Sequence, residues 1–259
     1  MGEGPTLRAF FPDMVPPPTL DERVCAYLTS LRALGLATAT APTISAVADQ
    51  DWGQAWREHF RPLAVGRRLV VAPPWDVPRS TGRIVLIIEP GRAFGTGHHG
   101  STAGCLGLLE CLMERDRPEA AIDVGTGSGI LAIAAARLGV SRILAIDDDP
   151  DAVANARTNL DLNGVAESID CRVDDATTFE TAPAPLILAN LLTAAHVRLA
   201  ARYRRLLAPG ASLVLGGILD GEADALRDDL RARGLVPTDA LSIDGWTALG
   251  FRAPVHDLA

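Results

Sequence analysis

Apolar, β-rich runs alternate with helical segments along most of the chain. Helical segments separate most of these runs, and strands that alternate with helices typically form a parallel sheet covered on both faces. The run from Gly129 to Leu138 is apolar nearly all round and is followed by Gly139, which predicts a buried crossover helix. The pattern therefore predicts a doubly wound α/β domain. Its expected strands are Arg68 to Ala72, Ile84 to Glu89, Ala121 to Val124, Arg142 to Ile146, Ile169 to Val173, Leu186 to Ala189 and Ser212 to Leu215.

The first sixty residues have a different pattern. A short strand-like run at 6–11 precedes a stretch from Leu20 to Leu34 whose apolar positions follow a helical period. Trp52, Trp56 and Phe60 then recur four residues apart, which predicts a connecting helix with an aromatic packing stripe. Three segments follow from this reading: a small α+β N-terminal domain at 1–47, a connecting helix at 48–62, and the large α/β domain at 63–259.

Composition narrows the class of protein. The 259 residues carry a net charge of −8, and no arginine-rich block reverses that field, so direct nucleic-acid binding is not expected. The four cysteines form no CxxC pair and the five histidines complete no metal-ligand spacing, which favours a reduced, cytoplasmic protein without a metal. No signal segment or membrane-spanning apolar run is present in the sequence, so no membrane association is expected.

The chain contains no lysine, because all 24 of its basic residues are arginine. A P-loop needs a lysine to reach the transferred phosphate, and a pyridoxal enzyme needs one for its Schiff base. Both classes of chemistry are excluded.

A glycine loop provides the central chemical signal. Gly125, Gly127 and Gly129 follow an apolar strand and open a helix, and glycines there allow a tight turn and close approach of a ligand. Ile130 stands where a dinucleotide fingerprint would place its third glycine, and Asp123 lies two positions before the first glycine. This arrangement resembles the first motif of the S-adenosylmethionine methyltransferases.

Polar residues at the ends of the following strands supply further candidates. Asp147 lies 22 positions after Gly125, where a carboxylate meets a ribose diol in this topology, while Asp149 is expected to cap the next helix. Asp175 follows the next strand and is a candidate to contact the edge of the adenine ring, although an acidic residue on a solvated loop would explain its presence nearly as well. Asn190 ends a later strand, where it could orient an attacking amine or cap the turn.

Upstream, a glycine-rich run from Glu89 to Thr102 precedes a helix and could fold closely over a ligand. Its adjacent histidines lack a third ligand and are poor evidence for a metal. With these motifs the sequence resembles the PrmA family, the methyltransferases of the large-subunit ribosomal protein L-eleven (L11). The resemblance rests on Glu89 to Thr102, Asp123 to Leu131, Ile146 to Pro150, Ala189 to Leu192, Gly216 to Leu219, and Asp51-Trp52 with Trp56.

The resemblance implies a Rossmann-like class I methyltransferase fold that uses S-adenosylmethionine and releases S-adenosylhomocysteine. It also implies that Thr102, Gly125, Asp147 and Asn190 contact the cofactor. Asn190, whose position at the end of a strand suits an acceptor for the attacking amine, is the candidate catalytic residue. Two departures stand out: the N-terminal domain is shorter than the family's substrate-recognition domain, and Ser101 replaces the usual threonine. The predicted cofactor site comprises Phe94, Gly95, Thr96, Thr102, Asp123, Gly125, Thr126, Gly127, Asp147, Asp148, Asp175 and Asn190.

The expected function is therefore S-adenosylmethionine-dependent N-methylation of lysine side chains, the N-terminal amine, or both, on ribosomal protein L11, by a monomer. Three alternatives stay open. The same fold could methylate another protein or a small molecule; the glycine loop could serve a nicotinamide-dependent oxidoreductase; or the chain could bind the cofactor without methylating anything.

Overall fold

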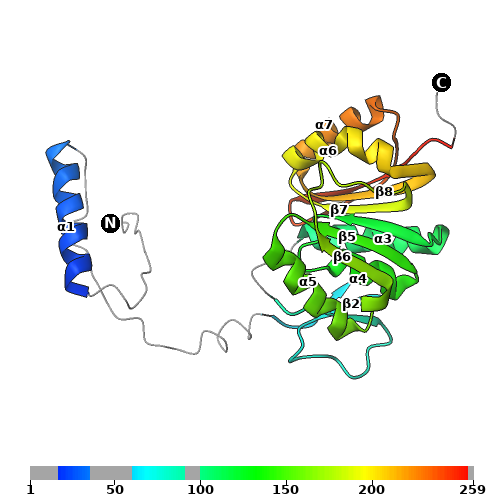
Figure 1. Ribbon diagram of the computed structural model, residues 1–259, viewed down its shortest axis with the longest axis horizontal. Coiled ribbons are helices and arrows are strands. Elements are labelled where there is room, and N and C mark those ends of the chain that lie inside the picture. The colour runs from blue at the N-terminus through cyan, green and yellow to red at the C-terminus, as the bar shows by residue number, and fades with distance from the viewer. Residues whose placement is uncertain (1–16, 36–59, 91–99, 256–259) are drawn as a thin grey trace. The chain divides into compact units, whose positions relative to one another are not determined.

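The computed structural model describes residues 17–35, 60–90 and 100–255, and its contacts divide the chain into two compact units, residues 1–56 and 57–259 (Figure 1). In the first unit, α1 (Pro17–Ala33) confirms the helix predicted over residues 20–34. The strand predicted at 6–11 and residues 48–59 of the connecting helix predicted at 48–62 lie outside the described residues. The boundaries predicted for the N-terminal domain and the connecting helix therefore stay predictions.

Within the described residues, seven strands form the central sheet of the second unit, in the order β6-β5-β4-β7-β8-β10-β9. Neighbouring strands from β6 to β8 pair in parallel, whereas β10 runs antiparallel to both β8 and β9. The predicted doubly wound, mainly parallel, seven-stranded sheet is thus confirmed. The strands are β4 (Ala120–Val124), β5 (Arg142–Asp147), β6 (Ile169–Val173), β7 (Ala184–Asn190), β8 (Leu207–Leu219), β9 (Val236–Ile243) and β10 (Trp246–Arg252).

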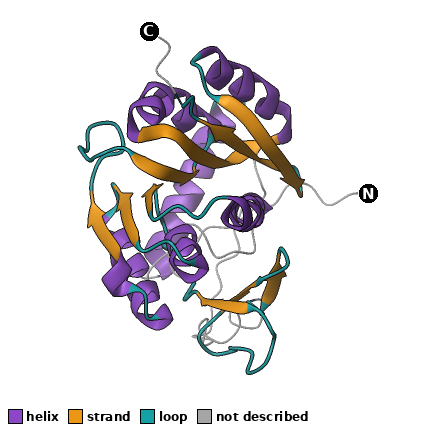
Figure 2. Cartoon of the chain, turned by 90° about the vertical axis from the view of Figure 1, so that its right-hand side faces the viewer, coloured by secondary structure: helices purple, strands orange, loops and turns teal. Residues whose placement is uncertain are grey.

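Helices cover both faces of this sheet (Figures 1 and 2). Alternate residues of each strand point to opposite faces, so Ile143 of β5 belongs to the core cluster that includes α3, α4 and α5, while Ile146 belongs to the cluster that includes α6 and α7. Burial on both faces explains why the inner strands read as nearly continuous apolar runs. The helices are α3 (Gly100–Arg115), α4 (Ile130–Leu138), α5 (Pro150–Asn163), α6 (Thr193–Leu206) and α7 (Asp220–Ala232), with a short 3₁₀ turn, η2 (Ala166–Ser168).

Two strands expected in the parallel sheet lie elsewhere. β2 (Leu69–Ala72) and β3 (Ile84–Ile87) form a separate sheet with β1 (Leu63–Val65), in which β1 is antiparallel to β2 and β2 is parallel to β3. In the described part of the chain, the outer edge of β3 contacts an α5 side chain and no further strand. The strands that complete the main sheet are β9 and β10, which the sequence reading did not predict.

Candidate active site

The order of the strands reverses beside β4, the strand that begins the α/β alternation. β5 and β6 lie on one side of it, and β7 and β8 lie on the other. In open α/β sheets such a switch point creates a crevice at the carboxyl ends of the strands, where ligands bind. The glycine loop follows β4, Asp147 ends β5 and Asn190 ends β7, so the fold brings these three predicted features to one edge.

The side chain of Leu191, which follows β7, packs closely against the backbone of Gly125 in the glycine loop. Gly125 has a φ of +69°, in the left-handed region, and a Cβ built on it would lie 2.4 Å from Cδ2 of Leu191. A larger residue at this position would therefore be strained and would also push the Leu191 side chain aside. The glycine loop and the Asn190 segment are consequently in direct contact.

Asp123 lies beneath the glycine loop and is 1% exposed. Its Oδ2 accepts hydrogen bonds from Oγ1 of Thr126, at 2.7 Å, and from the backbone N–H of Ala132 in the first turn of α4, at 3.2 Å. Burial raises the pKa of Asp123 to about 7, although these two hydrogen bonds oppose the shift. A protein carboxyl group thus occupies the anion position at the helix N-terminus, where a dinucleotide fold would bind pyrophosphate.

Asp147 is half-buried and is held by two backbone groups. Its Oδ2 accepts from the N–H of Gly127 at 2.9 Å, and its Oδ1 accepts from the N–H of Asp149 at 3.1 Å. An ionised carboxylate has about four acceptor positions, so each oxygen keeps capacity for a ligand hydroxyl. Asp149 caps α5 by accepting from the N–H of Asp151 at 2.9 Å, which confirms its predicted role, and Asp148 beside it is exposed.

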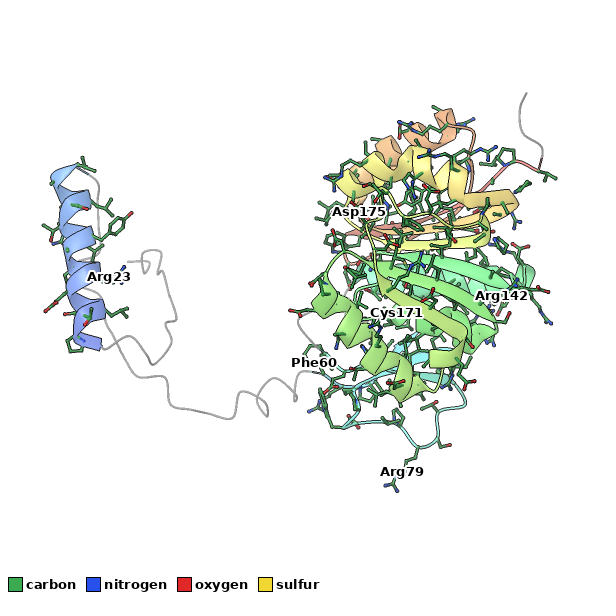
Figure 3. All side chains as sticks on the ribbon, in the orientation of Figure 1. Arg23, Phe60, Arg79, Arg142, Cys171 and Asp175 are labelled. Atoms are coloured by element: carbon green, nitrogen blue, oxygen red, sulfur yellow. The ribbon has the colours of Figure 1, made fainter. Side chains whose placement is uncertain are left out.

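Asp175 lies on the loop that follows β6, toward the carboxyl edge of the sheet, whereas Arg142 begins β5 at the opposite edge (Figure 3). One of its carboxylate oxygens accepts from both the N–H and the hydroxyl of Thr177, at 2.7 Å each. These hydrogen bonds lower the pKa of Asp175 below its ordinary value. The loop itself is joined to β5, because the N–H of Asp174 donates to the carbonyl of Asp147 at 3.0 Å.

Asn190 carries a hydrogen-bond acceptor that has no partner among the described residues. Its Nδ2 donates to Oγ1 of Thr102 at 3.1 Å, and Thr102 is fully buried in the first turn of α3. Its Oδ1 is buried and has no hydrogen-bond partner among the described residues. Because the hydroxyl of Thr102 holds the amide nitrogen, the amide oxygen is the atom left to accept from a ligand.

The sequence analysis did not predict that a buried asparagine joins the glycine loop to the segment after β3. Asn159 of α5 is fully buried; its Nδ2 donates to the carbonyl of Ser128 at 2.9 Å, and its Oδ1 accepts from the N–H of Glu89 at 2.8 Å. One turn later Asn163 accepts from the N–H of Ile87 at 2.9 Å and donates to its carbonyl at 2.6 Å. The two asparagines therefore take the place of a strand along β3, and Asn159 alone also reaches the glycine loop. Their i, i+4 spacing was the available signal.

A buried histidine near Asn190 was missed as well. His196 of α6 lies within hydrogen-bond distance of Tyr203, also on α6, and of the carbonyl of Gly216 in β8. The interval of seven residues between His196 and Tyr203 places both on one helix face.

Three predicted cofactor residues, Phe94, Gly95 and Thr96, lie outside the described residues. Among the residues that are described, no group of three or more His, Cys, Asp or Glu side chains could hold a metal ion, and no helix is long and apolar enough to cross a membrane. A cavity of about 160 Å³ is lined by residues of α3, β8, β9 and β10, among them Ser212 and Arg252, and contains none of the predicted site residues.

Comparison with known proteins gives a consistent set of relatives. The family model of ribosomal protein L11 methyltransferase (PrmA) matches residues 7–254. Ribosomal protein L11 methyltransferase of Pelobacter propionicus is 42% identical over 218 residues, which cover 82% of this chain and 69% of that protein. The protein of the same name from Geobacter metallireducens is 37% identical over 264 residues, which cover 98% of this chain and 84% of the relative.

A solved structure agrees with these relatives. The ribosomal protein L11 methylase of Lactobacillus delbrueckii subsp. bulgaricus aligns with a TM-score of 0.66 at 26% identity, and the match covers 75% of this chain and 100% of that chain. The residues matched by the family model include every described side chain of the site.

Proposed function

The chain belongs to the ribosomal protein L11 methyltransferase (PrmA) family, and we propose that it transfers methyl groups from S-adenosylmethionine to amino groups of ribosomal protein L11. The acceptors would be lysine side chains, the N-terminal amine, or both. The match over residues 7–254 supports this function more strongly than methylation of another protein or a small molecule.

The residues at the switch point fit the cofactor. Asp147 offers acceptor positions for ribose hydroxyls, and it is hydrogen-bonded to the glycine loop that follows β4. Asp148 lies next to Asp147, and Asp175 follows β6 toward the same edge, where we place the adenine. S-adenosylmethionine supplies the methyl group on a positively charged sulfur, which the acidic side chains of this edge favour.

Other parts of the predicted cofactor site have a supporting role in this proposal. Asp123 and Thr126 hold the glycine loop from beneath, and the N–H of Gly127 orients the carboxylate of Asp147 toward the ribose. Phe94, Gly95 and Thr96 stay predictions from the resemblance.

The observation that carries the catalytic proposal is the unpartnered Oδ1 of Asn190. An amine that is about to be methylated keeps N–H groups that need an acceptor, and a fixed acceptor aims its lone pair. Thr102 fixes the amide by accepting from its nitrogen. Transfer is an in-line displacement that depends on holding the reacting atoms about 3 to 3.5 Å apart and aligned.

An amide suits this position better than a carboxylate would. A lysine amine has an ordinary pKa of about 10.4 and must lose its proton before it can attack. A carboxylate beside it would stabilise the ammonium and raise its pKa, whereas a neutral amide oxygen accepts an N–H without adding a negative charge. Burial of the amine at the end of β7 lowers its pKa further in the required direction.

The structure argues against the nicotinamide alternative at one specific place. A dinucleotide needs the N–H groups of the glycine loop and of the helix N-terminus for its pyrophosphate. Here the carboxylate of Asp147 takes the N–H of Gly127, and Asp123 takes that of Ala132. A pyrophosphate would have to displace or approach two carboxyl groups.

We also propose that residues 1–47 recognise the protein substrate, with 48–62 as the connection to the catalytic domain at 63–259. The separation of residues 1–56 as a unit supports this division. Tyr27 of α1 is 64% exposed and is a candidate contact. Replacing Tyr27 by Ser should raise the KM for L11 and leave the Kd for S-adenosylmethionine unchanged; a parallel loss of cofactor affinity would contradict a recognition role.

The main test uses the purified full chain, recombinant L11 and S-adenosylmethionine, with intact-mass analysis of both proteins. We expect L11 to gain mass in steps of about 14 Da, one methyl group replacing one hydrogen in each step. Asn190→Ala should lower kcat about 100-fold, since misplacement of an acceptor costs that much, while the cofactor still binds in calorimetry.

A second pair of variants separates cofactor binding from acceptor binding. Asp147→Ala should weaken S-adenosylmethionine binding at least about tenfold, because it removes charged hydrogen bonds. Asp161→Asn, a matched change of an exposed carboxylate on α5, should bind as the wild type does. If the cofactor binds but L11 gains no mass, the methyl acceptor must be a molecule other than L11. If Asp147→Ala binds S-adenosylmethionine normally, the proposed cofactor site is wrong.

A further inference from the structure

His196 is an ionisable side chain that the proposed transfer does not use directly. It is 0% exposed, lies in the first half of α6, and interacts with Tyr203, with Gly216 and with the backbone of Leu191. Its Nε2 is 2.7 Å from the carbonyl oxygen of Gly216, and its Nδ1 is 2.9 Å from the hydroxyl of Tyr203.

The partners determine which nitrogen of His196 carries the proton. A carbonyl oxygen can only accept, so Nε2 must donate to Gly216, and Nδ1 then accepts from the hydroxyl of Tyr203. Burial lowers the pKa of His196 to about 4, so the ring is neutral at physiological pH. The hydrogen bonds therefore run in one direction, from Tyr203 through His196 to Gly216.

Gly216 is the residue opposite Asn190 in the pairing of β7 with β8. Its carbonyl accepts from His196 and also, at 3.1 Å, from the N–H of Leu191, the residue after Asn190. A Cβ on Gly216 would lie 3.1 Å from Oδ1 of Asn190 and 2.3 Å from Sγ of Cys105. The peptide group of Gly216 thus forms part of the surface against which the Asn190 amide rests.

We propose that His196 is a positioning residue for methyl transfer, which holds the carbonyl of Gly216 so that the segment from Asn190 to Leu191 keeps its place beside the glycine loop. The inference rests on the proposed role of Asn190. His196 acts through Gly216 and does not touch the acceptor amine or the cofactor. The geometric basis is that one carbonyl joins α6, β8 and the residue following Asn190.

The kinetic test compares three variants of α6 in the full chain. His196→Ala should lower kcat about 10- to 100-fold, because displacement of the reacting groups by about 1 Å has that effect, and should leave the Kd for S-adenosylmethionine within about threefold. His196→Gln should recover most of kcat, since its amide N–H can donate to Gly216 and its oxygen can accept from Tyr203.

Leu199→Ala is the matched control for lost packing. Leu199 is buried on the same helix, and the substitution opens a cavity while leaving the hydrogen bond from His196 to Gly216 in place. We expect its kcat to stay near that of the wild type. Equal losses of kcat in His196→Ala and Leu199→Ala, or no recovery in His196→Gln, would overturn the positioning role.

A second measurement needs no methyl acceptor. Hydrogen exchange of the Leu191 amide should accelerate in His196→Ala and not in Leu199→Ala or His196→Gln, because the carbonyl of Gly216 is the acceptor of that N–H. Wild-type protein that transfers nothing to L11 would count against the proposed acceptor, and the exchange result would still decide the present inference. Unchanged exchange of Leu191 in His196→Ala would reject it.

Discussion

Asp123 and His196 should make opposite contributions to the pH dependence of stability, and Asp123→Asn should separate them. Both side chains are almost completely buried, Asp123 beneath the glycine loop and His196 behind Gly216. Burial disfavours the charged form of each, so it raises the pKa of Asp123 from 3.8 to about 7 and lowers that of His196 from 6.5 to about 4. The asparagine variant retains the shape of the neutral acid but cannot titrate.

The signs follow from which state binds more protons. Between pH 4 and 7 the folded state keeps the proton on Asp123 and the unfolded state loses it, so this contribution is present below about pH 4 and is lost as the pH rises to 7. Between pH 4 and 6.5 the unfolded state protonates His196 and the folded state does not, so this contribution is present above pH 6.5 and is lost as the pH falls toward 4. The two contributions largely cancel in the wild type.

The magnitudes are large enough to measure. A tenfold change in proton affinity corresponds to about 1.4 kcal/mol, so the difference in stability between wild type and Asp123→Asn should move by roughly 3 kcal/mol in favour of the wild type from pH 7.5 to 4.5. The difference between wild type and His196→Gln should move by roughly 2 to 3 kcal/mol in the other direction. Other carboxylates titrate in this range, but they do so in both members of each pair.

Urea unfolding followed by circular dichroism at pH 4.5, 5.5, 6.5 and 7.5 gives the required free energies of unfolding. Asp161→Asn, which removes an exposed carboxylate of α5, serves as the control. If the difference between wild type and Asp123→Asn is the same at all four pH values, the reasoning from burial of Asp123 is wrong.

Three further predictions concern packing, loop support and self-modification. Gly216→Ala should destabilise the fold by about 1–3 kcal/mol through overpacking, and Cys105→Ala in the same chain should recover part of this loss in urea unfolding, because it removes the sulfur 2.3 Å from the new Cβ. Asn159→Ala should weaken S-adenosylmethionine binding in calorimetry, and Asn163→Ala should not, because only the first of these asparagines also donates to Ser128 of the glycine loop. A chain without lysine should gain no methyl group on its own side-chain amines when incubated with S-adenosylmethionine alone, and a methylated side chain in its peptide map would contradict an amine-specific transfer.

Local patterns explain how much of the fold could be predicted. The glycine loop, the acid at the end of β5 and the cap at Asp149 are sequence-local features, fixed by glycine conformations and by hydrogen bonds between near neighbours. The apolar runs of β4, β5, β7 and β8 read clearly because these inner strands are largely buried on both faces. β9 was missed because its positions alternate between exposed and partly buried. It also contains Pro237, and a proline weakens the prediction of a strand because it cannot donate a backbone hydrogen bond.

The separate sheet illustrates what periodicity cannot decide. The runs that form β2 and β3 look like strands of the main sheet, since a strand pattern does not specify its neighbours. Their placement depends on Asn159 and Asn163, whose side chains form hydrogen bonds with the backbone at the outer edge and end of β3 from a helix about 70 residues later. Such partners are distant in sequence, and the i, i+4 spacing of the two asparagines does not show which strand they contact.

By itself, the sequence determined the class of fold, the glycine loop and the acids and amide at the ends of β5 and β7. Each of these depends on residue type and short spacing. The tertiary structure alone decided that Asp123 is buried, that Thr102 holds the nitrogen of Asn190 so that its oxygen stays open, and that His196 donates to Gly216. These properties depend on desolvation and on hydrogen-bond partners brought together from separate strands and helices, which arise only when the sheet and its covering helices assemble.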